Sequence, residues 1–176
     1  AAVEQLQIWG QRTGAPVILA RDTLRRGVRR AVIANSKVSN VATGAAGVNN
    51  ARRMAAAAAL ELGTSADRVL VSSTGVIGVP LPIEKIENGV VGMSRDLQDD
   101  PMVGAEGIMT TDSHPKALSA SVGDATITWV AKGSGMIEPN MATMLSYIFT
   151  DAAIDAPTLD RLLRAGVGTS FNMLSV

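Results

Sequence analysis

Short apolar runs alternate with helix-like segments along this chain, and that alternation limits the folds open to it. Residues 49–63, NNARRMAAAAALELG, predict a helix, because alanine has the highest helix propensity and Gly63 stands where a left-handed residue would end it. Residues 68–73, RVLVSS, predict a buried strand that runs directly into the turn TGVIG at 74–78. Strands and helices in alternation favour an α/β fold built in layers.

The other expected elements continue this pattern. We expect strands at 15–20 (APVILA), 29–35 (RRAVIAN) and 124–133 (DATITWVAKG), with a polar turn of helix, RDTLRRG, between the first two. We expect helices at 80–89, with Pro82 in the first turn, at 100–112, opened by Asp100, and at 158–166, preceded by Asp155 and Pro157. A further helix is expected from Ala142 onward, because apolar residues recur there at helical spacing: Met141, Met144, Leu145 and Ile148.

Composition excludes several classes of function. The 176 residues are 47% hydrophobic, and Lys+Arg and Asp+Glu number 16 each, so nothing points to a nucleic-acid or anionic-membrane surface. The nearest basic cluster, Arg25, Arg26, Arg29 and Arg30, is typical of a solvated face. The chain has no cysteine and one histidine, His114, so no thiol or multi-histidine metal site is expected. No apolar run approaches a membrane span, and AAVEQLQIWGQ is not a signal peptide, so we expect a cytoplasmic protein.

Two segments could carry chemistry. In STGVIG, glycines at 75 and 78 would let the backbone turn sharply and direct N–H groups at an anion or oxyanion, although an ordinary turn has the same sequence. In KGSGMIEPNMATML, residues 132–145, Thr143 is either a hydroxyl bonded back to the preceding helical turn or a nucleophile. A threonine nucleophile needs a base, and its own α-amino group would serve if the Ala142–Thr143 bond were cut.

KGSGMIEPNMATML resembles the self-cleavage segment of the ornithine acetyltransferase family, also called glutamate N-acetyltransferases, of arginine biosynthesis. Three further segments are similar to family segments and stand in family order: 51–63 (ARRMAAAAALELG), 69–86 (VLVSSTGVIGVPLPIEKI) and 107–116 (GIMTTDSHPK). The likeness is nearly continuous from Ala15 to Ala152. It identifies the chain as a member of that family, from the sequence alone.

The resemblance implies a reaction and two chains. Members cut themselves before the Thr of MAT, here the Ala142–Thr143 bond, which makes 1–142 an α-chain portion and 143–176 the start of a β chain. Thr143 would then accept the acetyl group of N-acetylornithine and pass it to glutamate by ping-pong kinetics. Whether acetyl-CoA is also a donor stays open, and no metal or other cofactor is implied. The implied fold is an α/β sandwich with intertwined α and β chains, assembled as an α2β2 heterotetramer.

The resemblance also implies the site residues. Thr74 and Gly75 match the oxyanion-hole positions, and Thr143 would stand at a helix N-terminus, in its positive partial field. Substrate contacts carry over to Thr143, Lys132 and the TTD threonine, which is Thr110, with Thr111 as the alternative. Lys132 and Thr110 also have purely structural interpretations, in which Lys132 is a solvated strand end and Thr110 is a helix cap. Asp112 and Glu138 could tune the site or be surface charges, and His114 has no assigned role.

The chain departs from the family pattern in three places. NSKVSN at 35–40 has Lys37 and Val38 where members carry the small and amide residues of NSGNAN, which leaves specificity open. AAVEQLQIWGQ differs from the usual opening, and a DGDTSTND-like segment is expected beyond Val176. Two other functions stay open: an amidase or aminopeptidase with an N-terminal nucleophile, and a non-catalytic binding or scaffold domain.

Overall fold

A computed structural model describes residues 14–24, 29–135, 137 and 144–176. It divides at Asp99–Asp100 into two compact units, each of which is described by itself. Both contain helices and sheet, so the predicted α/β class is confirmed. In the described residues, no helix combines the length and the apolar character needed to cross a membrane.

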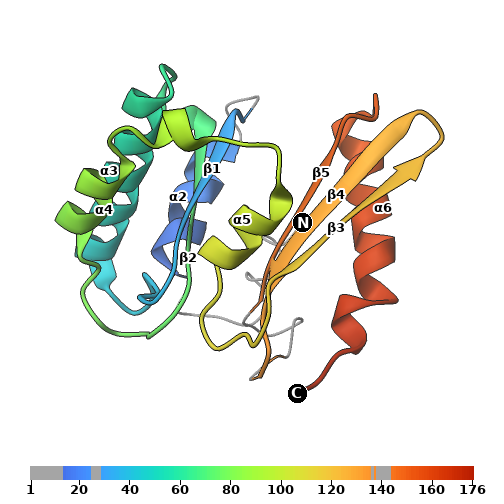
Figure 1. Cartoon of the computed structure of the whole chain (residues 1–176). Coiled ribbons are helices and arrows are strands. Elements are labelled where there is room, and N and C mark those ends of the chain that lie inside the picture. Colours follow the sequence, from blue (N-terminus) through green and yellow to red (C-terminus); the bar gives the residue numbers. More distant parts are fainter. Residues whose placement is uncertain (1–13, 25–28, 136, 138–143) are drawn as a thin grey trace. The chain divides into compact units, whose positions relative to one another are not determined.

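The first unit, residues 10–99, is built on two parallel strands (Figure 1). Strand β1 (Ala31–Asn35) pairs with β2 (Val69–Ser73) in a register that runs from Ala31 opposite Val69 to Asn35 opposite Ser73. The crossover between them contains helix α3 (Gly44–Glu61) and the short turn η1 (Ala66–Arg68). Parallel strands require such a crossover, because no tight turn can join them.

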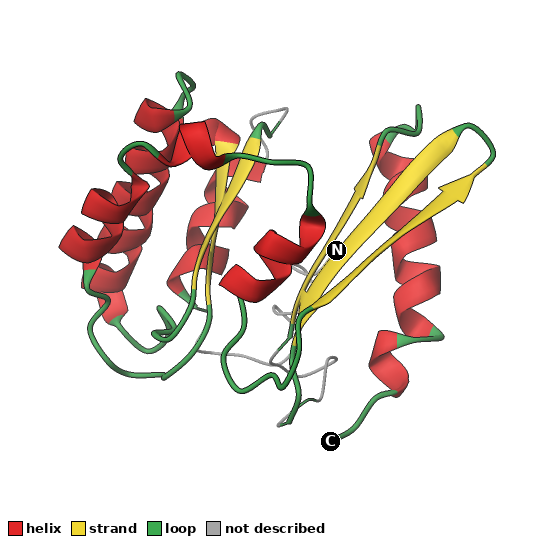
Figure 2. Cartoon of the chain, viewed as in Figure 1, coloured by secondary structure: helices red, strands yellow, loops and turns green. Residues whose placement is uncertain are grey.

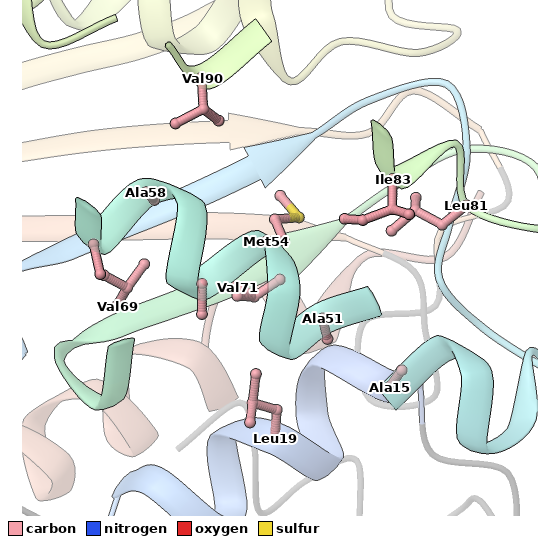
Figure 3. Close-up of a cluster of buried hydrophobic side chains, with 12 residues drawn as sticks. Ala15, Leu19, Ala51, Met54, Ala58, Val69, Val71, Leu81, Ile83 and Val90 are labelled. Atoms are coloured by element: carbon pink, nitrogen blue, oxygen red, sulfur yellow. The ribbon is translucent and has the colours of Figure 1, made fainter. Parts of the chain in front are cut away.

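The core of this unit lies where α3 packs on β2 and on helices α2 (Ala15–Leu24) and α4 (Ile83–Val90) (Figure 3). Ala51 and Met54 of α3 are fully buried, and Val69 and Val71 of β2 lie in the same cluster. The alanine-rich face of α3 therefore lets neighbouring elements approach closely. The helix ends as expected, because Gly63 just beyond it has φ 61°. After α4, Gly92 (φ 85°) precedes η2 (Met93–Asp96).

The expected strand at 15–20 is wrong, because these residues form most of α2. Helix formation begins at Gly14, whose carbonyl accepts the N–H groups of Val17 and Ile18. The run buries Ala15 and Leu19, which lie one helical turn apart on the face toward α3. A short apolar run fits a buried strand and a buried helix equally, so periodicity could not separate them.

The second unit, which begins at Asp100, contains an antiparallel sheet in the order β3–β4–β5 (Figure 2). Its strands are β3 (Lys116–Val122), β4 (Ala125–Lys132) and β5 (Leu145–Thr150), and β3 was not predicted. Helix α5 (Pro101–Gly107) contacts β3 and β4, and its Asp100 cap accepts the N–H of Met102 as expected. Helix α6 (Ala156–Gly168), capped by Asp155, and the turn η3 (Phe171–Met173) follow β5.

The expected helix from Ala142 onward is also wrong, because Leu145–Thr150 form strand β5. This segment pairs antiparallel with β4, with Leu145 opposite Lys132 and Tyr147 opposite Val130. Side chains of aromatic and β-branched residues such as Tyr147, Ile148 and Phe149 favour strands, and sheet pairing outweighed the helical spacing of the apolar residues. The expectation of a helix N-terminus at Thr143 depended on that helix, and Thr143 itself lies outside the described residues.

Candidate active site

The structure describes two groups of the predicted site residues. Thr74 and Gly75 belong to the first unit, whereas Thr110, Thr111 and Lys132 belong to the second. The predicted cleavage bond, Ala142–Thr143, lies outside the described residues, as does Glu138. Each group is therefore described through its own surroundings.

Thr74 and Gly75 form the turn that follows strand β2. The Thr74 N–H donates to the Asn35 carbonyl at 3.0 Å, which continues the β1–β2 pairing by one residue, and Thr74 is 8% exposed. Gly75 has φ 129°, a conformation that side-chain-bearing residues rarely adopt. In the described residues, the Gly75 N–H donates to no backbone carbonyl. The Thr74 N–H is thus used within the sheet, whereas the Gly75 N–H makes no such backbone bond among the described residues.

The segment that departs from the family pattern lies directly against this turn. A Cβ on Gly75 would stand 2.2 Å from the carbonyl carbon and oxygen of Lys37. The Val76 N–H donates to the Lys37 carbonyl at 3.0 Å, and Val38 forms an isolated parallel bridge with Val76. Lys37 itself has φ 78°, in the left-handed region that favours glycine. The departure at 37–38 is therefore adjacent to the predicted oxyanion hole.

Asn35 holds this arrangement in place. Its side-chain amide donates to the Val38 carbonyl at 2.8 Å, and its side-chain oxygen accepts the Ser73 hydroxyl at 2.6 Å. One side chain thus ties the end of β2 to the loop that leaves β1. The geometry of the Thr74–Gly75 turn depends on this loop.

In the second unit, Lys132 and Thr110 meet. The Lys132 ammonium donates to the Thr110 hydroxyl oxygen at 2.8 Å, and Lys132 is only 8% exposed at the end of β4. Lys132 is therefore not a solvated strand end. A hydroxyl that accepts from a cation can still donate its own hydrogen, so the Thr110 O–H, next to a positive charge, is suited to a carboxylate or carbonyl oxygen.

The alternative threonine, Thr111, has a different partner. Its hydroxyl lies 3.4 Å from the hydroxyl of Ser134, which also donates to the Thr111 carbonyl at 3.1 Å. The structure thus brings Thr110, and not Thr111, to Lys132. His114 is on an exposed loop, where its ring contacts the Ser113 hydroxyl.

Asp112 organises this region, and the sequence could not distinguish it from a surface charge. Its carboxylate accepts the Lys116 ammonium at 2.8 Å, the Gly133 N–H at 2.6 Å and the Thr110 N–H at 3.2 Å. Burial raises the pKa of Asp112, but the bonds from Lys116, Gly133 and Thr110 and the Lys116 charge together hold it well below its usual range. Asp112 is therefore a buried anion.

Burial also lowers the pKa of Lys132, and the charge of Lys116 adds to this effect, whereas the negative charge of Asp112 opposes it. One buried carboxylate thus interacts electrostatically with two ammonium groups in this site. Within the described part of the chain, no three His, Asp or Glu residues are grouped so that they could hold a metal ion.

Comparison with known proteins shows what this chain is similar to. Residues 10–176 match the ArgJ family. The arginine biosynthesis bifunctional protein ArgJ of Thermotoga neapolitana is 48% identical over 168 residues, which cover 92% of this chain and 42% of that protein. The ArgJ of Geobacter sulfurreducens is 44% identical and matches 100% of this chain and 46% of its own length. The chain thus spans less than half the length of these relatives.

Solved structures agree with the sequence comparison. The ornithine acetyltransferase of Mycobacterium tuberculosis, determined in complex with ornithine, has a TM-score of 0.70 and 36% identity, over 77% of this chain and 74% of that one. The ArgJ of Bacillus halodurans has a TM-score of 0.57 and 28% identity, over 77% and 73% of the two chains. Sequence and fold agree, and the chain belongs to the ArgJ family.

Proposed function

We propose that this chain carries part of an ornithine acetyltransferase of arginine biosynthesis, which transfers acetyl from N-acetylornithine to glutamate. In the first half-reaction the Thr143 hydroxyl attacks the acetyl carbonyl, and the Thr143 α-amine takes the hydroxyl proton and delivers it to the departing amine of ornithine. In the second, the glutamate amine attacks the acetyl-Thr143 ester, and the hydroxyl is regenerated. The two half-reactions share one covalent intermediate, so the kinetics are ping-pong.

The Thr110–Lys132 pair in an ArgJ-family chain is the observation that carries this proposal. The Lys132 ammonium and the Thr110 hydroxyl lie 2.8 Å apart, and Lys132 is 8% exposed, so a cation and a hydroxyl meet in a mostly buried place. N-Acetylornithine and glutamate each carry an α-carboxylate, which an ammonium and a hydroxyl bind well. The solved relative from Mycobacterium tuberculosis binds ornithine, which is the product of the first half-reaction.

Thr74 and Gly75 serve as the oxyanion hole in this proposal. The Gly75 N–H would donate to the developing negative charge, and the Thr74 hydroxyl would turn toward the same oxygen when substrate binds. The Thr74 N–H is bonded to Asn35 and is not one of the donors. Loss of one such donor typically costs about 100- to 1000-fold in rate.

Self-cleavage would prepare the nucleophile. The Thr143 hydroxyl attacks the Ala142 carbonyl, and the peptide C–N bond breaks to give an ester and a free Thr143 amine. Water then hydrolyses the ester, which releases the Ala142 carboxylate and regenerates the Thr143 hydroxyl. Residues 1–142 then belong to an α chain and 143–176 to a β chain, which we propose assemble as an α2β2 heterotetramer in the cytoplasm. The proposal needs no metal or cofactor, and acetyl-CoA as a second donor is a separate question.

The test is intact mass and N-terminal sequencing of the complete protein, followed by an acetyl-transfer assay. We expect two chains, one of which begins Thr-Met-Leu-Ser-Tyr, and acetyl transfer to glutamate. Thr143→Ala should abolish both, whereas Thr143→Ser, which keeps a hydroxyl, should retain some cleavage. Cleavage before residue 143 in the Thr143→Ala variant would refute the assignment of Thr143 as the nucleophile. Transfer to water alone would indicate an amidase or aminopeptidase, and an uncut, folded, inactive wild type would indicate a scaffold.

A further inference from the structure

The carboxylate of Asp112 joins two segments that are distant in the sequence. Its side chain is fully buried. Its Oδ2 accepts the N–H of Thr110, and its Oδ1 accepts both the N–H of Gly133 and the ammonium of Lys116. Thr110 follows α5, whereas Gly133 follows the last residue of β4. The carboxylate therefore fastens the Thr110 loop to the end of β4.

These two anchor points adjoin the two groups that would bind substrate. Gly133 is the next residue after Lys132, and Thr110 bonds Asp112 through its own backbone. The side chains of Lys132 and Thr110 then meet at 2.8 Å. Gly133 has φ 142°, a conformation that residues with a side chain rarely adopt. The position of each group is thus tied to one carboxylate.

We propose that Asp112 is a positioning residue, which holds the Lys132 ammonium and the Thr110 hydroxyl together as one carboxylate-binding pair. Asp112 does not itself contact the substrate in this proposal. The inference rests on the proposed function, because that function makes Thr110 and Lys132 the ligand groups. It adds a residue that the sequence left as either a site residue or a surface charge.

The charges around the pair make the inference testable. Among the residues that the structure describes, two charged groups shift the pKa of Lys132: Asp112, whose charge raises it, and Lys116, whose charge lowers it. Strand β5, which pairs with β4 on the other side, has no charged residue, and Glu106 of α5 is exposed. Removing Asp112 or Lys116 should therefore move the titration of Lys132 in opposite directions. The ornithine affinity then tests positioning, because the charge of Asp112 alone does not place the Lys132 ammonium and the Thr110 hydroxyl side by side.

The first measurement uses the complete protein without substrate. Acetic anhydride labels an amine only when it is unprotonated, so the rate of Lys132 labelling against pH, followed by peptide mass spectrometry, reports its titration. We expect the profile to move to lower pH in Asp112→Asn and to higher pH in Lys116→Met. Asp151→Asn is the matched control, because Asp151 also accepts a backbone N–H, from Thr126 at the opposite end of β4. Its profile should match the wild type.

The second measurement is the affinity for ornithine by calorimetry. Asparagine keeps the shape of the side chain but places an N–H₂ group toward one of the donors that Asp112 now binds. We expect affinity to fall about 10- to 100-fold in Asp112→Asn, because a small displacement of a binding group has effects of this order. Affinity should be unchanged in Asp151→Asn.

The possible results distinguish a failure of the proposed function from a failure of the positioning role of Asp112. A wild-type protein that does not bind ornithine would refute the proposed function, and the inference with it. Wild-type ornithine affinity in Asp112→Asn would overturn the inference alone, whatever the Lys132 profile, because the charge of Asp112 shifts that profile even if it positions nothing. If Asp112→Asn fails to fold, the ornithine affinity of Asp112→Glu decides, because glutamate keeps the charge but moves the carboxylate by one methylene. A fall in affinity supports the inference, and wild-type affinity overturns it.

Discussion

Replacing Gly75 by alanine should damage the first unit more than any ordinary Gly-to-Ala change. Gly75 has φ 129°, and the new Cβ would lie 2.2 Å from the carbonyl carbon and oxygen of Lys37 and 2.7 Å from the Val38 nitrogen. All three are backbone atoms, so no side-chain rotation can relieve the overlap. The loop at 37–38 or the turn after β2 must move.

Gly78 provides a matched comparison in the same turn. It also has a positive φ, of 80°, but a Cβ there would meet nothing within 4 Å. Both substitutions pay for the left-handed backbone, about 1 kcal/mol, and both lose the same backbone freedom in the unfolded chain. Only Gly75→Ala adds steric overlap, which typically lowers the unfolding free energy by about a further 1–3 kcal/mol. We therefore expect losses of about 1 kcal/mol for Gly78→Ala and about 3 kcal/mol for Gly75→Ala.

Thermal unfolding followed by circular dichroism would measure the difference. At about 2–4 °C per kcal/mol, Gly78→Ala should lower Tm by about 2–4 °C and Gly75→Ala by about 6–12 °C. Gly75→Ala should also lose acetyl transfer, because the displaced N–H no longer faces the oxyanion. Equal losses of Tm in the two variants would refute the close approach of Gly75 to Lys37.

Two further predictions concern Lys37 and Asp112. Lys37→Gly should raise stability by up to about 1 kcal/mol, because glycine adopts the φ of 78° without strain, whereas Lys37→Ala should not; equal urea midpoints for the two variants would contradict this. Folding lowers the pKa of the Asp112 carboxyl group. The ionised carboxylate therefore contributes its full stabilisation above the pKa that Asp112 has in the unfolded chain, near 4, and this stabilisation is lost as pH falls through the pKa in the folded protein. The difference in unfolding free energy between wild type and Asp112→Asn should therefore narrow in urea titrations below about pH 4, and a constant difference would contradict the buried ionised carboxylate.

Local signals predicted several elements correctly. The alanine run of α3 has high helix propensity at nearly every position, and its end at Gly63 requires only a residue that tolerates positive φ. Asp100 and Asp155 cap α5 and α6 with their own side chains. Strands β1, β2 and β4 are apolar or alternating runs between turn residues. The physical causes of these elements lie within a few residues of each one.

The errors arose where a distant partner decided the structure. Residues 15–20 and 145–150 are short apolar runs, and each fits a helix or a strand. The first became α2 because it packs on α3, and the second became β5 because β4 offers it a complete ladder of hydrogen bonds. Strand β3 was missed because most of its residues are exposed, and its pairing with β4 holds it in the sheet.

The candidate site divides in the same way. The amino-acid sequence by itself determined the family, and with it the candidates Thr74, Gly75, Thr110, Lys132 and Thr143, because these lie in contiguous motifs. Only the tertiary structure decided that Thr110 rather than Thr111 meets Lys132, that Lys37 lies against Gly75, and that Asp112 is buried between two lysines. Burial and charge pairing depend on segments that are far apart in the chain, and a local sequence pattern does not show which of these segments come into contact.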